Sequence, residues 1–320
     1  MAHARTAVLL MAHGTPDSLD QMPEYLIRVR NGRPPSPQLV EEIRRNYAAI
    51  GGRSPLTDIT REQAAALQAT LGADVPVLVG MRNWHPYIAN ALAQLPSTVD
   101  RVVGIPLAPQ FSTSSVQKYV EAALAAMPDG VRFDCVASFH DHPLLAEAFA
   151  DRVRRAPPEP GEEVIFTAHS VPVRVVEEGD PYADQVAATA AAVAARAGLV
   201  AYHRAYQSAG RTPEPWLGPD ITQVIRDRAA AGTRRFLIVP IGFVCDHTEV
   251  LFDLDIQAAR VARESGAELR RTESLNTSPV FIRLLAALVN EEIGRTTIGF
   301  GNQDSGVRSG LTDLRLNPDS

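Results

Sequence analysis

The chain is poor in cysteine, and this scarcity excludes two kinds of protein. Only Cys135 and Cys245 occur among its 320 residues. Two cysteines so far apart cannot form the disulfide framework of a small secreted domain. An iron–sulfur cluster is normally held by about four cysteine thiolates, so we expect no such cluster either.

Long apolar runs and an excess of positive charge are also missing. The sequence contains no stretch of roughly eighteen apolar residues, the length needed to cross a membrane. The run Ala7–Ala12 is too short for the core of a signal peptide. A net charge of −6 argues against a general nucleic-acid binder, which would carry a basic face. The chain has 45% hydrophobic and 21% charged residues, which is typical of a globular protein. We therefore expect a protein of the reducing cytoplasm that does not insert into membranes.

The sequence does contain a regular alternation of apolar strands and helices. Strands are predicted over residues 7–12, 75–80, 101–109, 131–139, 164–168, 202–206 and 235–244. Helices are predicted over residues 36–50, 54–71, 84–95, 116–124, 180–197 and 278–294, several of them begun by a capping residue and a proline. This alternation predicts βαβ units, a mainly parallel sheet and hence an α/β fold.

A histidine follows one of these strands directly. In the stretch Val164-Ile-Phe-Thr-Ala-His169-Ser-Val-Pro172, strand-forming residues lead into His169 and a proline ends the strand. The pattern predicts that His169 lies at the carboxyl end of a buried strand, where open α/β sheets bind their ligands. A histidine in this position can also be purely structural.

The same unit occurs near the amino terminus. There, Leu10-Met-Ala-His13-Gly-Thr-Pro16 matches the order strand, Ala-His, two residues, proline. A second pair of stretches, Arg101–Pro109 and Arg235–Val244, shares a basic residue, an apolar strand and a proline in the same place. Two such repeated patterns suggest an internal duplication.

Acidic residues follow the last of these strands. If the chain is helical from Asp246, then Asp246, Glu249, Asp253 and Gln257 fall on one face at spacings of three, four and four. One interpretation is an exposed acidic surface. The other is a path for a cation, since divalent metals of hard or borderline character prefer oxygen and imidazole ligands.

Two other features also allow two interpretations. The basic cluster of Arg28, Arg30 and Arg33 could be a solvated surface or a clamp for carboxylates, which guanidinium groups match in geometry. Trp216 lies in a proline-rich segment and could be a packing residue or an aromatic wall for a flat ligand.

Taken together, these stretches resemble the ferrochelatase family from about Ala7 to Gly294. The matching segments are Gly51-Gly-Arg-Ser-Pro55-Leu, Ala108-Pro-Gln-Phe-Ser-Thr113, Phe166-Thr-Ala-His-Ser-Val-Pro172, Gly179-Asp-Pro-Tyr182, Tyr206-Gln-Ser208, Pro215-Trp-Leu-Gly-Pro219 and Val239-Pro-Ile-Gly-Phe-Val-Cys-Asp-His-Thr-Glu249. The chain is most similar to the short, soluble, cluster-free enzymes of Gram-positive type, which insert iron into coproporphyrin III.

The resemblance implies two Rossmann-like halves, each a mainly parallel sheet flanked by helices, with the porphyrin in a cleft between them. We place the halves at residues 1–156 and 157–294, with a linker at Pro157–Gly161 and a C-terminal helix that could cross back to the first half. Residues 295–320 are polar and rich in Gly, Asp and Ser, and are predicted to form a weakly ordered tail.

The resemblance also implies roles for individual residues. It makes His169 and Glu249 the catalytic and metal-binding pair, with Asp253 on the path of the metal from solvent. Further porphyrin-binding positions are implied at His13, Arg30, Asn46, Tyr47, Ser54, Tyr119 and Trp216. A neutral imidazole at His169 would suit a base near pH 7.

This chain departs from the family pattern at a few of these positions. His13 stands where coproporphyrin-type members usually have a tyrosine whose oxygen approaches the product iron; an imidazole could ligate iron through nitrogen instead. Asn31 and Asn46 replace basic residues, and Gln257 replaces a glutamate at the end of the acidic stripe. That last change removes a charge from the predicted metal path and puts a secondary divalent-cation site in doubt.

The function implied is insertion of Fe²⁺, as a substrate, into coproporphyrin III by a monomeric enzyme without a permanently bound cofactor. Protoporphyrin IX is the alternative porphyrin. A cobalt or nickel chelatase would share the two-half architecture but usually uses paired histidines as its metal base. A non-catalytic haem-binding protein of the two-lobed periplasmic type would need an export signal.

Overall fold

The strands form two parallel four-stranded sheets, one in each half of the chain. The computed structural model describes residues 5–295. Its strands are β1 (Thr6–Ala12), β2 (Val77–Met81), β3 (Arg101–Pro106), β4 (Arg132–Cys135), β5 (Glu162–His169), β6 (His203–Gln207), β7 (Arg235–Val239) and β8 (Glu268–Arg271). The order is β2-β1-β3-β4 in the first sheet and β6-β5-β7-β8 in the second. The expected fold of two Rossmann-like halves is confirmed.

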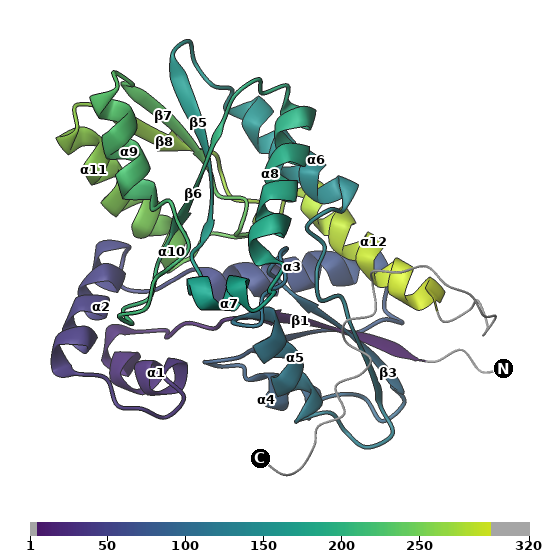
Figure 1. The fold of residues 1–320 in the computed structure, drawn as a ribbon. Helices are drawn as coiled ribbons and strands as arrows, with labels where there is room; N and C mark the ends of the chain where they lie inside the picture. Colours follow the sequence, from purple (N-terminus) through teal and green to yellow (C-terminus); the bar gives the residue numbers. More distant parts are fainter. Residues whose placement is uncertain (1–4, 296–320) are drawn as a thin grey trace.

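Helices connect and flank these strands (Figure 1). In the first half they are the short 3₁₀ turn η1 (Leu19–Gln21), α1 (Met22–Val29), α2 (Pro37–Ala49), α3 (Leu56–Leu71), α4 (Ile88–Leu92), α5 (Val116–Leu124) and α6 (Pro143–Arg155). In the second half they are α7 (Val173–Glu177), α8 (Tyr182–Ala197), α9 (Ile221–Ala230), α10 (Thr248–Leu251), the π-helical segment η2 (Asp253–Ala258), α11 (Ala259–Glu264) and α12 (Pro279–Arg295).

The two sheets repeat one topology. In each sheet the first strand in sequence pairs with the second on one side and the third on the other, all in parallel register. His13 directly follows β1, and His169 is the last residue of the equivalent strand β5. Both histidines therefore lie where the strand order reverses, the position at which open parallel sheets bind ligands. The matching order supports the duplication inferred from the sequence.

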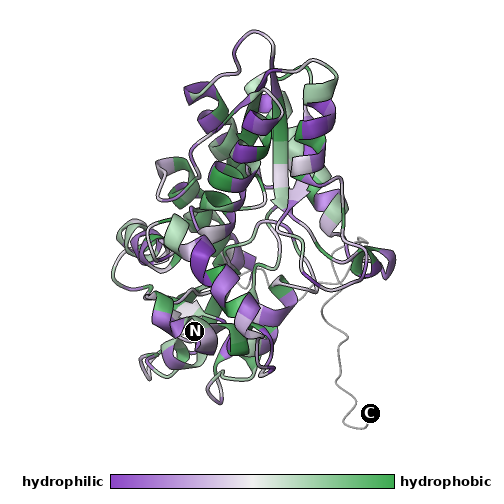
Figure 2. Cartoon of the chain, turned by 90° about the vertical axis from the view of Figure 1, so that its left-hand side faces the viewer, coloured by the Kyte–Doolittle hydropathy of each residue, from purple (hydrophilic) through white to green (hydrophobic). Residues whose placement is uncertain are grey.

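One hydrophobic core joins the two halves. Every residue of β1 is buried, and the largest core cluster contains Val8 and Leu67 from the first half together with Phe166, Leu237 and Leu285 from later elements. Figure 2 shows hydrophobic residues along the central strands and more hydrophilic ones on the outward helix faces. Because burial of apolar area is the dominant favourable term in folding, this shared core fixes the halves against each other.

Helix α12 follows the last strand of the second half but packs against α3 and α6 (Figure 1). The Arg101 guanidinium at the start of β3 donates to the Glu292 carbonyl on α12 at 2.7 Å. The predicted boundary at residues 156–157 lies between α6 and β5. Of the predicted tail, only Arg295, the end of α12, lies within the described residues.

One predicted helix is much shorter than expected. The sequence indicates a helix over Trp84–Leu95, but the structure has only Ile88–Leu92. The amide of Met81 at the end of β2 donates to the Pro86 carbonyl at 2.6 Å. This bond folds residues 82–87 into a loop back onto the strand, so the helix begins after it. Within residues 5–295, no helix is long and apolar enough to cross a membrane.

A half-buried carboxylate ties the start of β5 to the elements beside it. Glu163 accepts two hydrogen bonds from Arg228, at 2.8 and 2.7 Å, and one from Thr233 at 2.6 Å. The Arg228 hydrogen bond, opposed by burial, lowers the pKa of the Glu163 carboxyl to about 2, below its ordinary 4.5. The ionised carboxylate therefore stabilises the fold above about pH 4.5, and this contribution is lost as the pH falls toward 2.

We expect Glu163→Gln to lower the free energy of unfolding at pH 7 by about 2 to 3 kcal/mol. The difference from the unmodified protein should shrink between pH 4.5 and pH 2, because a protonated Glu163 resembles the amide. Urea unfolding at about pH 7, 5 and 3.5 measures it. Glu264→Gln is the control, since Glu264 has an exposed partner at 3.8 Å. A difference independent of pH would contradict the assignment.

Candidate active site

A pocket of about 980 Å³ lies between the two halves, at the carboxyl ends of the strands. Residues from both halves line it, as expected for a ligand site at the reversal points of two parallel sheets. The site residues predicted from the sequence that line it are His13, Asn46, Tyr47, Tyr119, His169, Trp216, Glu249 and Asp253, together with Gln257.

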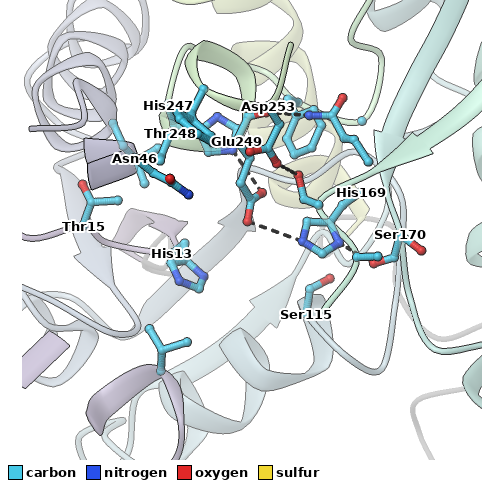
Figure 3. A pocket seen from close by; sticks show the side chains of 18 of the residues that line it. His13, Thr15, Asn46, Ser115, His169, Ser170, His247, Thr248, Glu249 and Asp253 are labelled. Atoms are coloured by element: carbon cyan, nitrogen blue, oxygen red, sulfur yellow. Dashed lines mark hydrogen bonds and ion pairs between the residues drawn. The ribbon is translucent and has the colours of Figure 1, made fainter. Parts of the chain in front are cut away.

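The carboxylate of Glu249 lies between two imidazoles (Figure 3). Its Oε1 is 3.4 Å from Nε2 of His169, and its Oε2 is 3.3 Å from Nε2 of His247. The side chains of His169 and Glu249 remain 36% and 39% exposed, so both can reach a ligand. The two residues that the family resemblance pairs are therefore adjacent, although 80 positions apart in sequence.

Backbone and neighbouring groups fix this cluster. Ring nitrogen Nδ1 of His169 contacts the Ser170 carbonyl, and the Tyr182 hydroxyl donates to the His169 carbonyl at 2.9 Å. The amide of Gln207, the residue beside His169 in the sheet, donates to the Glu249 carbonyl at 2.5 Å. These contacts fix the backbone of both residues and the ring of His169, as a preorganised site requires.

Glycine is required where the loop after β7 reaches this cluster. A Cβ on Gly242 would lie 2.7 Å from both Cα and Cβ of Ala168, closer than real contacts allow. The Gly242 amide donates to the Thr167 carbonyl at 3.1 Å. The absence of a side chain therefore lets residues 241–249 pass directly beside the end of β5, which brings Glu249 to His169.

His247 was not predicted from the sequence as a site residue. Its Nδ1 contacts the Cys245 carbonyl at 3.0 Å and its ring packs near Phe243, with centroids 4.9 Å apart. The residue lies two positions before Glu249 within a segment that matches the family pattern. That spacing was the available signal, but an extended backbone at His247, with φ −161°, is what turns both side chains to one point.

The His169–Glu249 contact is an ion pair. Burial opposes charging His169, but the charge of Glu249 and hydrogen bonds to Glu249 and the Ser170 carbonyl raise the pKa of the imidazole to about 9. Burial likewise opposes the ionised form of Glu249, yet the two imidazoles hold its pKa well below the usual 4.5. In the metal-free protein the pair therefore favours an imidazolium over the neutral imidazole expected from the sequence, so His169 must lose this proton before it can act as a base or bind a metal.

The acidic stripe is only partly as predicted. Asp246 precedes the helix and turns away to accept from Arg271, Ser274 and Asn276 at 2.8 to 2.9 Å. The helix begins at Thr248 and continues through the π segment η2, where the Gln257 amide bonds to the Phe252 carbonyl five residues back.

The π segment sets the direction of the remaining stripe. Side chains four residues apart drift by about 40° per step on an α-helix, and a π turn holds roughly one residue more. The widened turn offsets that drift, so Glu249, Asp253 and Gln257 all line the pocket.

Asp253 is the second carboxylate on this face. It accepts a hydrogen bond from the hydroxyl of Ser208, the residue that follows β6. Burial and the nearby charge of Glu249, partly opposed by that hydrogen bond, raise the pKa of Asp253 to about 6. Gln257 lies beyond it and carries no charge, and Asp246 turns away, so two carboxylates remain on this face.

His13 lies on the side of the pocket that faces the Glu249–His169 pair (Figure 3). Its Nε2 is 3.1 Å from the Tyr25 hydroxyl, and its ring nitrogens are within 3.3 Å of the Asn83 amide. Burial, reinforced by the charge of Arg82 and opposed by that of Glu249, lowers the pKa of His13 to about 4. His13 is therefore a neutral imidazole near pH 7.

Aromatic side chains form the apolar walls. Tyr25, Tyr47 and Tyr119 are buried and line the pocket, and burial raises the pKa of each phenol, that of Tyr47 to about 12. Trp216 fits both interpretations offered for it. Its ring packs against Gly210, its indole N–H donates to the Thr212 hydroxyl at 3.2 Å, and it still borders the pocket.

Two predicted porphyrin-binding residues lie outside the pocket lining. Arg30 is exposed in the loop after α1, where it and Arg33 each donate to the other's carbonyl. Ser54 is buried, and its hydroxyl accepts from the Leu56 amide at 3.4 Å. Their roles stay predictions. The arginines that do line the pocket are Arg82, Arg211 and Arg260, which no local sequence pattern distinguished.

The comparisons with known proteins agree with this geometry. The ferrochelatase family model matches residues 5–293. A ferrochelatase of Deinococcus radiodurans is 44% identical over 300 residues, covering 89% of this chain and 95% of the relative. A coproporphyrin III ferrochelatase of Bacillus subtilis is 37% identical over 310 residues, covering 92% of this chain and the whole relative (100%).

Solved structures agree on the fold. The sirohydrochlorin chelatase SirB from Bacillus subtilis subspecies spizizenii in complex with cobalt superposes with a TM-score of 0.53 at 10% identity, covering 92% of this chain and 97% of that one. SirB from Bacillus subtilis with Fe³⁺ gives a TM-score of 0.56 at 13% identity over the same fractions. At such identities the likeness establishes the fold alone. With the family model spanning nearly every described residue, this chain belongs to the ferrochelatase family of enzymes.

Proposed function

We propose that this enzyme inserts Fe²⁺ into coproporphyrin III. The observation that carries the proposal is the Glu249 carboxylate held between two imidazoles at 3.3 and 3.4 Å, facing a pocket large enough for a flat macrocycle. Family membership supports the reaction. Relatives named coproporphyrin III ferrochelatase support this porphyrin, although a more similar relative is named simply ferrochelatase.

Metalation needs a base above the ring. Two pyrrole protons must leave while the metal enters, and a flat macrocycle directs its nitrogen lone pairs within its own plane. Bending the ring exposes them, and binding energy from the ring's edges can offset that strain. The buried tyrosines and Trp216 would contact the ring and hold it, while His169 and Glu249 lie together on one side of the pocket.

The same cluster suits Fe²⁺ as a substrate. Imidazole and carboxylate are good ligands for a borderline divalent metal, and such a ligand must be deprotonated to bind. Asp253 and Gln257 continue the same face of the helix and would lead the ion from solvent to Glu249. His247 contacts the other oxygen of Glu249 and gives the carboxylate a second partner that would hold it in place when His169 binds a metal.

A cobalt or nickel chelatase is the second candidate. The observation that favours it is the presence of two pocket histidines, His13 and His169, at equivalent positions of the two sheets. Family membership and the His169–Glu249 contact favour iron. The rates at which Fe²⁺, Co²⁺ and Ni²⁺ are inserted into the same porphyrin distinguish the two candidate functions.

We expect His169→Ala to lower the rate of iron insertion by at least about 1,000-fold, since both the metal ligand and the base are removed. Porphyrin affinity should change less than about threefold, because the aromatic walls remain. Anaerobic turnover followed by the Soret band, with porphyrin fluorescence quenching for affinity, measures the two effects.

His203→Ala is the matched control for this experiment. His203 lies in the same sheet, at the start of β6, and contacts Glu163 at 3.0 Å away from the pocket. That variant should turn over normally. Turnover of His169→Ala close to that of the control would overturn the assignment of His169.

The choice of porphyrin gives a separate prediction. Coproporphyrin III carries four carboxylates and protoporphyrin IX carries two, and three arginines line the pocket. We expect kcat/KM for iron insertion to favour coproporphyrin III by about tenfold or more, equivalent to about 1.4 kcal/mol. Parallel assays with the two porphyrins under the same detergent conditions measure the ratio. Equal efficiency, or a preference for protoporphyrin IX, would contradict the coproporphyrin assignment.

A further inference from the structure

An ion pair crosses the mouth of the pocket. The guanidinium of Arg211, in the loop after β6, makes two hydrogen bonds to the carboxylate of Glu42 on α2. Both residues line the pocket, and their side chains remain 57% and 39% exposed. The contact therefore joins the two halves at the solvent edge of the site rather than in its interior.

The loop that carries Arg211 is held firmly at its base. The Val173 amide donates to the Pro215 carbonyl at 2.9 Å, and the Leu217 amide donates to the Val171 carbonyl at 2.8 Å. The Ser170 hydroxyl donates to the Leu217 carbonyl at 2.7 Å. The loop is thus fixed to the residues that follow His169, and its direction is set by the end of β5.

The tip of this loop is closed by Trp216. A Cβ on Gly210 would lie 2.3 Å from the indole ring, so the ring packs directly on the backbone before Arg211. The indole N–H is occupied by the Thr212 hydroxyl. The backbone at Arg211 is therefore held in place beside the aromatic wall. Only the Arg211 side chain has to move for its guanidinium to change partners.

Glu42 lies on a helix face that turns toward the pocket. Glu42, Ile43, Asn46 and Tyr47 all line it, as residues one turn apart on one face of α2 do. Tyr47 belongs to a small separate core with Met22, Tyr25, Leu26 and Trp84. The carboxylate of Glu42 is thus presented at the rim by a helix whose position does not depend on the ion pair.

We propose that Arg211 is a substrate-positioning residue that binds a peripheral carboxylate of the porphyrin, and that Glu42 occupies the same guanidinium between turnovers. The two partners present the same group to the guanidinium, a planar carboxylate that accepts two parallel hydrogen bonds. An exposed ion pair contributes little net free energy, so a carboxylate on a ligand already held by the pocket can displace Glu42. The inference rests on the proposed function only in requiring a porphyrin with carboxylates at its edge.

A simple latch between the halves would predict something different. If the pair only closed the mouth over the ligand, removing either partner would break the same contact and change binding in the same direction. If Arg211 receives the substrate and Glu42 competes with it, the two substitutions act in opposite directions. The sign of each effect therefore decides between the two roles.

The experiment is fluorescence-quenching titration of metal-free coproporphyrin III with Arg211→Gln, Glu42→Gln, Arg211→Lys and the double variant Arg211→Gln/Glu42→Gln. We expect Kd to rise about tenfold in Arg211→Gln and to fall about threefold in Glu42→Gln. Arg211→Lys should lie between Arg211→Gln and the unmodified protein, since an ammonium lacks the bidentate fork. The double variant should match Arg211→Gln, because Glu42 competes only through that guanidinium.

Steady-state assays should show the same changes in KM with kcat within about twofold, because neither residue touches the reacting nitrogens. Arg155→Gln, which removes a comparable exposed pair on α6, should leave Kd unchanged. Coproporphyrin tetramethyl ester, the same macrocycle without carboxylates, should bind Arg211→Gln and the unmodified protein equally.

Effects of the same sign in both single variants, or changes below about twofold in Arg211→Gln, would overturn the proposal. The titrations contain no iron, so they test Arg211 independently of the proposed reaction. A failure of the proposed function would instead appear as absent or reversed porphyrin preference in turnover by the unmodified enzyme.

Discussion

The site depends on a fixed contact between two halves that each have their own sheet. The shared hydrophobic core provides most of this contact. A buried carboxylate adds hydrogen bonds that fix the relative orientation of the two halves. Asp180, before α8, accepts from the amide and hydroxyl of Thr113 in the first half at 2.6 and 2.8 Å. Hydrogen bonds to a charged group each contribute about 1.5 to 3 kcal/mol. Gln110 likewise donates to Thr189 and to the Ile241 carbonyl. With the halves held in this way, His13 on one sheet and His169 on the other face a single cavity.

Within that cavity, charge and apolar surface are separated. The two imidazoles and two carboxylates gather along the end of β5 and the helical segment after β7, whereas buried tyrosines form walls contributed largely by the first half. The arginines are distributed among three different segments of the lining. This division suits a flat ligand with a polar edge and a reactive centre, because rings can contact its face, guanidinium groups its edge, and imidazoles and carboxylates its centre.

Local sequence patterns predicted well what depends on neighbours in the chain. The apolar runs gave the central strands, and a histidine at the end of such a run placed His169 on the site. The same patterns failed where a distant contact decides: Met81 bonding to Pro86 shortened a helix, and Arg271 drew Asp246 out of the stripe. The Arg211–Glu42 pair joins residues 169 positions apart, so no periodicity could reveal it. The monomeric state and the cytoplasmic location stay predictions.

The π segment after Glu249 also limits which changes of sequence and length this helix can tolerate. Val250, Leu254, Ala258 and Ala262 are buried at intervals of four, parallel to the pocket-facing set at Glu249, Asp253 and Gln257. A π turn corresponds to one residue inserted into an α-helix. Losing one residue there would rotate everything after it by about 100° relative to what precedes it. The buried residues would then no longer face the core, and the pocket-facing residues would no longer face the pocket. Substitutions can therefore alter the chemistry of this helix, whereas a change in its length would disrupt both the fold and the site.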